Sequence, residues 1–301
     1  MMCERSLNIR QKIIAAKVSQ GWYAPHVPYV HEVDVSNILY FLSKINSNNT
    51  SSKITLNTLL VYVIVNAIKS CPAVNAHIYY NRRMASGYVE FMESIDINMP
   101  VLLPDGKMTA IKLIDFGNKK LREMQDYIRN VMEKIRASDM EVPLMKTALN
   151  DTFKMFLKGD VISSILRLLG LRVGRGRIRR IPLKKYNAYN SLPKDDRVLI
   201  DELSIGTVLI TNLGAALKNI RGFPALVSLL SPQVFSVGIG SIYDEPVISK
   251  EDDKEVAVST CKKIKFCYTF DHRALDFGDI IPFIKRVDDI LKDPDSYIEL
   301  N

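Results

Sequence analysis

The stretch Asp271-His272-Arg273-Ala274-Leu275-Asp276 decides the fold, and it follows the alternating run from Cys261 to Phe270. Alternation of this kind predicts a strand, so a histidine lies just past a strand end and a carboxylate follows it four residues later. Imidazole is the one side chain whose unperturbed pKa lies near neutrality, which makes it the simplest general base. On its own, a His-x-x-x-Asp pair is common and is more often a surface ion pair than a catalytic one.

The sequence after this motif predicts a helix. Apolar residues recur at helical spacing, with Phe283 eleven residues after His272 at the start of the helix. We expect Pro282 in the first helical turn, where amide hydrogens lack partners and proline is tolerated. The residues that carry this periodicity are Ile280, Ile284, Val287, Ile290 and Leu291.

Length and composition limit the class of protein. A chain of 301 residues with 47% hydrophobic residues suits one large domain or two small ones with a sizeable core. No apolar run approaches a transmembrane span, and the first residues lack the apolar region of a signal peptide. The four cysteines show no Cys-x-x-Cys spacing, so we expect reduced thiols and a cytoplasmic protein.

The net charge of +8 is concentrated in one segment. Residues 158–185 hold nine Lys and Arg and one acid, whereas the rest of the chain holds 32 basic and 32 acidic residues. Three interpretations stay open: a solvated face, a surface for an acidic partner such as a carrier protein or CoA phosphates, and a membrane-docking face helped by apolar residues at 162–169. We rank membrane docking last, and we expect no nucleic-acid partner because no aromatic residues interleave with the arginines.

The order of elements favours an α/β protein with a mixed sheet over a doubly wound parallel sheet, because helices and strands alternate irregularly. The segment Val142–Arg197 is irregular and strongly basic. The predicted helices cover residues 8–18, 37–45, 55–69, 119–137 and 161–171. The predicted strands cover residues 30–35, 77–80, 95–103, 108–114, 208–211, 234–239 and 263–270.

Several motifs in order resemble one family, the catalytic domain of 2-oxoacid dehydrogenase acyltransferases, within the chloramphenicol-acetyltransferase-like superfamily. The resemblance runs from about residue 5 to residue 297 and is weak only within 142–197. The His272 motif resembles the family's His-Arg-x-x-Asp-Gly signature. The other motifs are Arg10 to Ala24-Pro25-His26, Glu32–Val35, Pro72–Asn75, Ile210-Thr211-Asn212-Leu213-Gly214, the strand with Gly238 and Gly240, and a following turn at Pro246-Val247.

The resemblance implies a chloramphenicol-acetyltransferase-like mixed sheet with flanking helices that forms homotrimers or larger multiples of trimers. It implies one catalytic domain over residues 1–301 with a divergent basic insert at about 142–197. We expect no lipoyl domain and no subunit-binding domain, and therefore no lipoyl-lysine in this chain. The active site is expected at a subunit interface, with lipoyl or acyl carrier proteins acting in trans, through the basic segment in one interpretation.

The resemblance also implies a mechanism. His272 maps onto the general base that deprotonates a thiol, hydroxyl or amine acceptor, and Thr211 onto the hydroxyl that stabilises the oxyanion. Alternatively, Thr211 is an ordinary β-branched strand residue. CoA or acyl-CoA is expected as a cosubstrate, with no tightly bound cofactor and no metal.

Supporting roles follow for further residues. Asp276 is expected to be structural, as the partner of a buried arginine, with Arg10 and Arg273 as the candidates, or as a brace for the main chain. Asn212 is expected to brace the site through its amide. His26 is either near the channel or, as we favour, a plain linker histidine.

One position departs from the family pattern. Phe277 stands where the signature has glycine, and Gly278 follows it. If this position needs a positive φ, phenylalanine would be strained there and Gly278 would take the turn instead. Three functions therefore compete: a stand-alone acyltransferase, a core subunit of a 2-oxoacid dehydrogenase complex that uses lipoyl domains in trans, and a non-catalytic assembly subunit.

Overall fold

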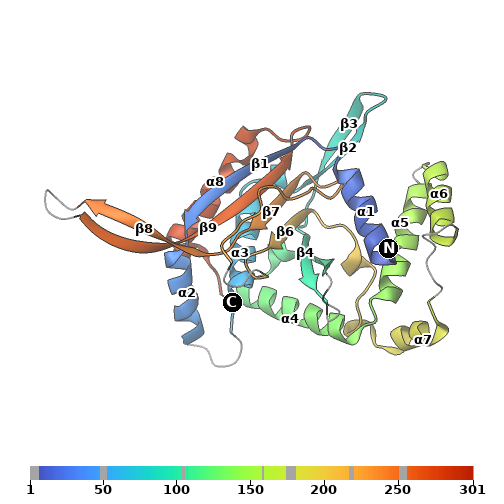
Figure 1. Ribbon diagram of the computed structural model, residues 1–301, viewed down its shortest axis with the longest axis horizontal. Coiled ribbons are helices and arrows are strands. Elements are labelled where there is room, and N and C mark those ends of the chain that lie inside the picture. The colour runs from blue at the N-terminus through green and yellow to red at the C-terminus, as the bar shows by residue number, and fades with distance from the viewer. Residues whose placement is uncertain are drawn as a thin grey trace, which may run out of the picture.

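The computed structural model of the protein describes residues 7–47, 53–103, 106, 108–157, 159–173, 181–216, 220–250 and 256–300 (Figure 1). The helices are α1 (Ile9–Gly21), α2 (Ser36–Ser47), α3 (Leu56–Lys69), α4 (Leu121–Ala137), α5 (Glu141–Leu157), α6 (Val161–Arg172), α7 (Leu183–Ser191), α8 (Phe277–Lys292) and α9 (Pro294–Tyr297). The strands are β1 (His26–Asp34), β2 (Ala76–Asn81), β3 (Ser86–Phe91), β4 (Ile97–Leu102), β5 (Met108–Leu113), β6 (Val208–Asn212), β7 (Phe235–Ile239), β8 (Tyr243–Lys250) and β9 (Val256–Asp271).

A mixed sheet forms the centre of the described chain, as the sequence predicts. Its order is β1-β9-β7-β6-β4-β5, with β8 paired to β9 outside this path. Strands β4, β6 and β7 are parallel, whereas β1, β5 and β9 pair antiparallel with their neighbours. The β2–β3 hairpin forms a second small sheet, and β8 with the first half of β9 extends from the body as a ribbon (Figure 1).

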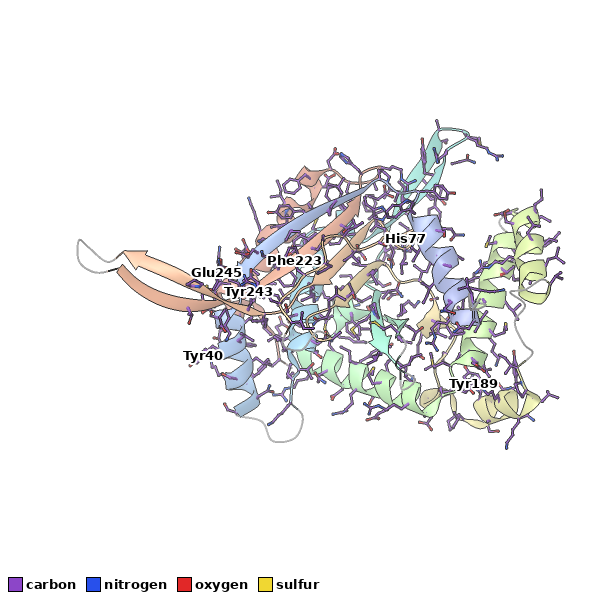
Figure 2. All side chains as sticks on the ribbon, in the orientation of Figure 1. Tyr40, His77, Tyr189, Phe223, Tyr243 and Glu245 are labelled. Atoms are coloured by element: carbon purple, nitrogen blue, oxygen red, sulfur yellow. The ribbon has the colours of Figure 1, made fainter. Side chains whose placement is uncertain are left out.

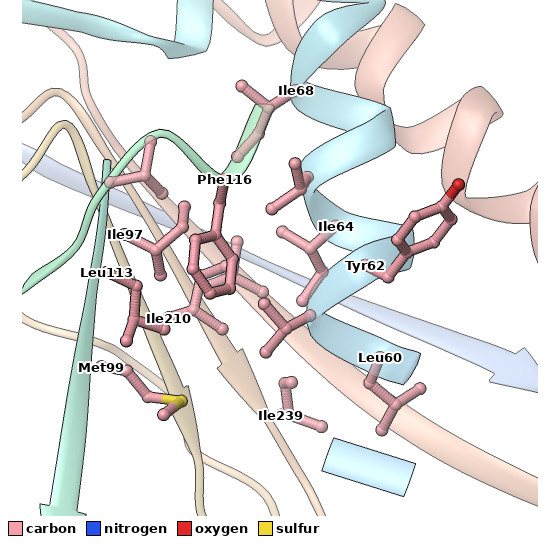
Figure 3. Packing of buried hydrophobic residues seen from close by; sticks show 14 of the residues in the cluster. Leu60, Tyr62, Ile64, Ile68, Ile97, Met99, Leu113, Phe116, Ile210 and Ile239 are labelled. Atoms are coloured by element: carbon pink, nitrogen blue, oxygen red, sulfur yellow. The ribbon is translucent and has the colours of Figure 1, made fainter. Parts of the chain in front are cut away.

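Helix α3 fills the core against one face of this sheet. The Thr55 hydroxyl begins the helix by accepting from the Thr58 amide at 3.2 Å. Side chains on several sides of the helix are fully buried, and Leu60 and Ile64 lie opposite the sheet residue Ile210 (Figure 3). Helix α8 packs beside α3 on this face, so the two helices hold the sheet at the strand end that carries His272.

Helix α8 corrects the expectations made for the end of the motif. It begins at Phe277, not near Phe283, so Pro282 lies inside the helix instead of in its first turn. Neither Phe277 nor Gly278 adopts a positive φ. Phenylalanine is therefore unstrained at the helix start, and Gly278 does not take a turn. The ring of Phe277 packs edge-on against Tyr29 with centroids 5.1 Å apart.

The turn expected at Pro246-Val247 is also wrong, because both residues lie within β8. Pro246 is tolerated there since β8 pairs on one side only, with β9, and an edge strand can lose one amide donor. Residues 142–197 contain α5, α6 and α7 where they are described, and α6 confirms the helix predicted over 161–171. Part of the basic segment, residues 158 and 174–180, lies outside the described residues. Among those described, no helix combines the length and apolarity needed to cross a bilayer.

Candidate functional site

His272 occupies the turn between β9 and α8. Its backbone N–H donates to the Pro25 carbonyl at 3.1 Å, which ties the turn to the chain just before β1. Its ring Nδ1 lies 3.1 Å from the Leu275 carbonyl oxygen and 3.2 Å from Asp276 Oδ1, and half of the side chain is exposed (52%). Because a carbonyl oxygen only accepts, this contact assigns the proton to Nδ1 and the lone pair to Nε2. A neutral imidazole held in this tautomer can accept a proton.

An ion pair with a buried carboxylate fixes the strand end just before this turn. The carboxylate of Asp271, 1% exposed, receives Arg273 Nε at 2.9 Å and Arg273 Nη2 at 2.6 Å. These hydrogen bonds raise the pKa of the Arg273 guanidinium. The expectation that Arg273 would pair with Asp276 is therefore wrong, since Asp271 binds two of the three guanidinium nitrogens.

Asp276 is an exposed residue at the first position before α8. Its backbone N–H donates to Asp279 Oδ2 at 2.7 Å, and its own carboxylate is 81% exposed and faces His272 Nδ1. Its carboxylate is therefore not buried against an arginine, and its expected role as a brace for the main chain stays a prediction. Arg10, the other expected partner of Asp276, lies in the first turn of α1. The carboxylate of Asp276 is placed to stabilise the charge that His272 acquires when Nε2 takes a proton.

His26 is held by backbone groups on both ring nitrogens. Nδ1 lies 2.8 Å from the Ala24 carbonyl oxygen, and the Leu229 N–H donates to Nε2 at 3.0 Å. A neutral ring with its proton on Nδ1 satisfies both contacts. This geometry favours the linker role. His26, which pairs with Asp271 at the start of β1, connects β1 to the loop before β7.

Thr211 and Asn212 end β6. The Asn212 amide donates to Asn57 Oδ1 at 2.9 Å, and its oxygen accepts the Ala215 N–H at 3.0 Å, so Asn212 links β6, α3 and the following turn. Thr211 itself is half-buried and pairs with Gly238 of β7. Gly238 is required there because a Cβ would lie 2.5 Å from side-chain atoms of Pro224 and Val227.

Within one chain, the structure does not bring Thr211 and His272 together. Thr211 pairs with Gly238, and Gly238 pairs with Cys267 of β9, which lies five residues before His272. With strands about 4.8 Å apart and about 3.3 Å per residue, the two residues are separated by roughly 19 Å. Moreover, β6 and β9 run in opposite directions, so their carboxyl ends lie at opposite edges of the sheet. One chain thus holds the two residues at opposite edges of the sheet.

The Thr211 edge carries a charged cluster that sequence reasoning missed. Glu32 accepts from the Tyr243 hydroxyl at 2.6 Å and pairs with Lys265 at 3.0 Å and Lys263 at 3.1 Å. The Tyr243 hydrogen bond, followed by those of the lysines, lowers the pKa of Glu32 to about 2. Tyr243 lies at the base of the ribbon near Phe223 (Figure 2). Only the pairing of β1, β8 and β9 brings these residues together, so no local motif could have revealed the cluster.

Comparison with solved structures defines the class of fold. The chain resembles a probable dihydrolipoamide acetyltransferase from Listeria monocytogenes, with a TM-score of 0.66 and 15% identity over 100% of this chain and 99% of that one. It also resembles the Azotobacter vinelandii dihydrolipoamide acetyltransferase (E2p), with a TM-score of 0.65 and 17% identity over 98% of this chain and 93% of that one. The expected fold class is thus confirmed.

Sequence comparison then gives the family. Residues 4–148 and 180–299 match the family described as 2-oxoacid dehydrogenases acyltransferase (catalytic domain), and the chain belongs to it. A curated relative is the dihydrolipoyllysine-residue acetyltransferase component of the acetoin cleaving system of Bacillus subtilis, 33% identical over 35% of this chain and 24% of that protein. Another is the corresponding component of the pyruvate dehydrogenase complex of Buchnera aphidicola, 23% identical over 46% of this chain and 35% of that protein. The chain therefore matches only about a quarter to a third of these relatives' length.

Proposed function

We propose that this chain is an acyltransferase that moves an acyl group between CoA and a thiol, hydroxyl or amine acceptor, with His272 as the general base. The observation that carries the proposal is the hydrogen bond between Nδ1 and the Leu275 carbonyl oxygen, which leaves the Nε2 lone pair to take the acceptor's proton. Family membership supports the reaction class. As the acceptor attacks the thioester, the oxygen of its carbonyl gains charge, and the Thr211 hydroxyl stabilises that charge.

Asp276 completes the proposed base. Proton uptake at Nε2 makes the imidazole cationic, and the carboxylate 3.2 Å from Nδ1 then stabilises the cation. The Azotobacter vinelandii enzyme has been studied for the role of a serine, a histidine and an asparagine in its catalytic mechanism, and the asparagine there stands four residues after the histidine. His272 and Asp276 have the same spacing, and we infer that Thr211 takes the role of the hydroxyl residue.

The working site is proposed to be composite, with His272 from one protomer and Thr211 from its neighbour. The separation of the two residues on opposite edges of one sheet supports this arrangement, because a single chain cannot place both at one thioester. We therefore propose a homotrimer or a multiple of trimers, in which each interface assembles one site. The acceptor would be a dihydrolipoyl group on another protein, a carrier-protein pantetheine, or a small amine or alcohol.

Subunit mixing tests the reaction and the composite site together. With acetyl-CoA and free dihydrolipoamide, we expect His272→Ala to lower kcat about a thousandfold and Thr211→Ala about a hundredfold. Mixing the two inactive variants in equal amounts under conditions of subunit exchange should restore about a quarter of the wild-type activity, since that fraction of interfaces receives both intact residues.

Each outcome of the mixing experiment is decisive. Transfer that survives His272→Ala unchanged would reject His272 as the general base, and a wild-type protein without any transfer would favour the non-catalytic assembly subunit. Loss of activity in both variants without recovery on mixing would place His272 and Thr211 in one chain and reject the composite site. Mixing His272→Ala with Asp276→Asn serves as the matched control, because these two residues lie in the same turn and no interface can combine an intact copy of both.

A further inference from the structure

Strand β6 is paired on one side only where it carries Thr211. Its pairing with β7 runs from Leu209 to Asn212, whereas its pairing with β4 covers only Val208 and Leu209. Asn212 is also the last residue of β6, so Thr211 lies one residue before the strand ends. The backbone ladder therefore holds Thr211 on the β7 side but not on the β4 side.

Thr211 and Asn212 face opposite sides of the sheet, because successive side chains of a strand alternate between its two faces. Asn212 lies on the face covered by α3, as Ile210 does in Figure 3. Thr211 lies on the other face, beside Gly238. No side-chain hydrogen bond holds the Thr211 hydroxyl in the part of the chain that the structure describes. The position of this hydroxyl therefore depends on the backbone at the end of β6.

The side chain of Asn57, in α3, connects β4 to the end of β6. Its Oδ1 accepts from Asn212 Nδ2 at 2.9 Å, and its Nδ2 donates to Met99 Sδ of β4 at 3.8 Å. Asn212 Oδ1 in turn accepts the Ala215 N–H at 3.0 Å. Asn57 thus links the two strands beyond the point where their backbone pairing stops.

The start of α3 gives Asn57 a fixed position. Asn57 is the second residue of this helix, between Thr55, which caps it, and Thr58, whose amide the cap receives. Gln125 Oε1 of α4 accepts from the Thr55 N–H at 3.0 Å and from the Thr58 hydroxyl at 2.7 Å. Because these contacts hold the first turn of α3, Asn57 is a rigid support for Asn212.

We propose that Asn57 is a positioning residue for acyl transfer, and that it acts on the Thr211 hydroxyl through Asn212. This role rests on the proposed function, in which that hydroxyl donates to the oxyanion. A donor stabilises the oxyanion only at a distance of about 3 Å, so a small shift at the end of β6 weakens the interaction in the transition state. Loss of Asn57 should therefore lower kcat and leave the KM for acetyl-CoA unchanged.

Steady-state kinetics of transfer from acetyl-CoA to dihydrolipoamide test this role in the full chain. We expect Asn57→Leu to lower kcat about tenfold and to change the KM for acetyl-CoA less than about twofold. Asn57→Ala, which removes the same amide without adding bulk, should have the same effect. The matched control is Asn66→Leu, which should leave kcat unchanged. Asn66 is also half-buried in α3, but it donates to the Tyr62 carbonyl of its own helix at 3.0 Å.

Double-mutant cycles test the path from Asn57 through Asn212 to Thr211. On a Thr211→Ala or an Asn212→Leu background, Asn57→Leu should cost no further activity, because the hydroxyl or its link to α3 is already lost. On an Asp276→Asn background the loss of about tenfold should persist, since Asp276 belongs to the His272 turn and shares no contact with Asn57.

Several results would overturn the role of Asn57. One is a kcat of Asn57→Leu equal to that of the wild type, and another is a loss of the same size when the Thr211 hydroxyl is absent. A third is that both Asn57 variants are unfolded in the assay by circular dichroism, which would assign Asn57 to the stability of the fold. A wild type without any transfer would reject the proposed function together with this role, whereas an active wild type with unaffected Asn57 variants would reject the role alone.

Discussion

Two regions of the molecule remove charged groups from water in different ways. One is the turn that carries His272, and the other is the helix pair α5–α6. In the turn, Asp271 and Arg273 meet through two short hydrogen bonds at the end of a strand in the main sheet. Between α1, α5 and α6, Lys17 is desolvated near Asp151 and Arg167, while the apolar residues of α6 face outward. The first arrangement is a local ion pair with short hydrogen bonds. The second is a helix pair whose apolar outer side is not covered within one chain.

This difference shows which part of the molecule is constrained by the catalytic fold. The turn joins β9 to α8, contacts Pro25 and sits within the family-matched residues. The α5–α6 pair lies mainly in the unmatched residues 149–179. A helix in the matched part, α4, buries Leu121, Met124 and Val131 as an amphipathic helix should. The outward-facing apolar side of α6 thus belongs to a segment outside the family match.

The largest expected effect is the loss of the ion pair in the turn. Arg273→Met leaves the buried carboxylate of Asp271 without its cation, and we expect the free energy of unfolding to fall by about 3 kcal/mol. The double variant with Asp271→Asn should recover most of this loss, because no buried charge is then unpaired. Urea unfolding measures the free energy of both variants. Asp276→Asn is the control, since its exposed pair with His272 is worth no more than about 1 kcal/mol.

An effect of Arg273→Met as small as that of Asp276→Asn would contradict this comparison. The turn would then be held mainly by its backbone contacts, such as the His272 N–H to the Pro25 carbonyl. The Asp271–Arg273 pair would be a consequence of the fold and would not fix the strand end.

The sequence was sufficient to predict the helices and strands whose apolar residues recur at a regular period. Helix α3 lies within one residue of its prediction, since its buried side chains and the Thr55 cap are local signals. The fold class followed from the irregular order of elements. β3 was missed because it is an exposed hairpin strand containing Gly87, and β8 because Pro246 within it indicated a turn.

For the site, the motif identified His272 but not the contacts around it. Two acids flank the histidine, and no local pattern tells which one turns inward, so Asp271 was overlooked and Arg273 was proposed, beside Arg10, as a partner of Asp276. The separation of Thr211 from His272 also required the sheet register, because it depends on the direction of β6 relative to β9. Likewise, the periodicity of α6 predicted a helix without showing which side meets the protein.

A smaller effect is expected from Lys17, a half-buried lysine between the helices. Lys17→Met removes a desolvated charge, and we expect the free energy of unfolding at neutral pH to rise by about 1 kcal/mol. Because the folded state lowers the pKa of Lys17, the unfolded chain binds more protons between that lowered value and 10.5, and wild-type stability rises with pH in this window. The advantage of Lys17→Met should therefore shrink as the pH approaches 10.5.

Urea unfolding at neutral pH and near pH 10 measures this change. Lys69→Met, at an exposed position in the last turn of α3, is the matched control and should show neither the gain nor its pH dependence. A Lys17→Met variant that is less stable than the wild type at neutral pH would show instead that the attraction of Lys17 for Asp151 outweighs the cost of burial.

The smallest expected effect concerns the outer side of α6. It tests directly whether the apolar side chains of this helix face outward. Ile162→Ser with Leu166→Ser should change the free energy of unfolding by less than about 0.5 kcal/mol in the absence of lipid, because these side chains bury little of their surface in the chain. Met124→Ser in α4, where the side chain is fully buried, should cost about 3 kcal/mol in the same thermal unfolding assay. Similar losses in the two helices would mean that the aliphatic residues of α6 are covered in solution, by another part of the chain or by another copy.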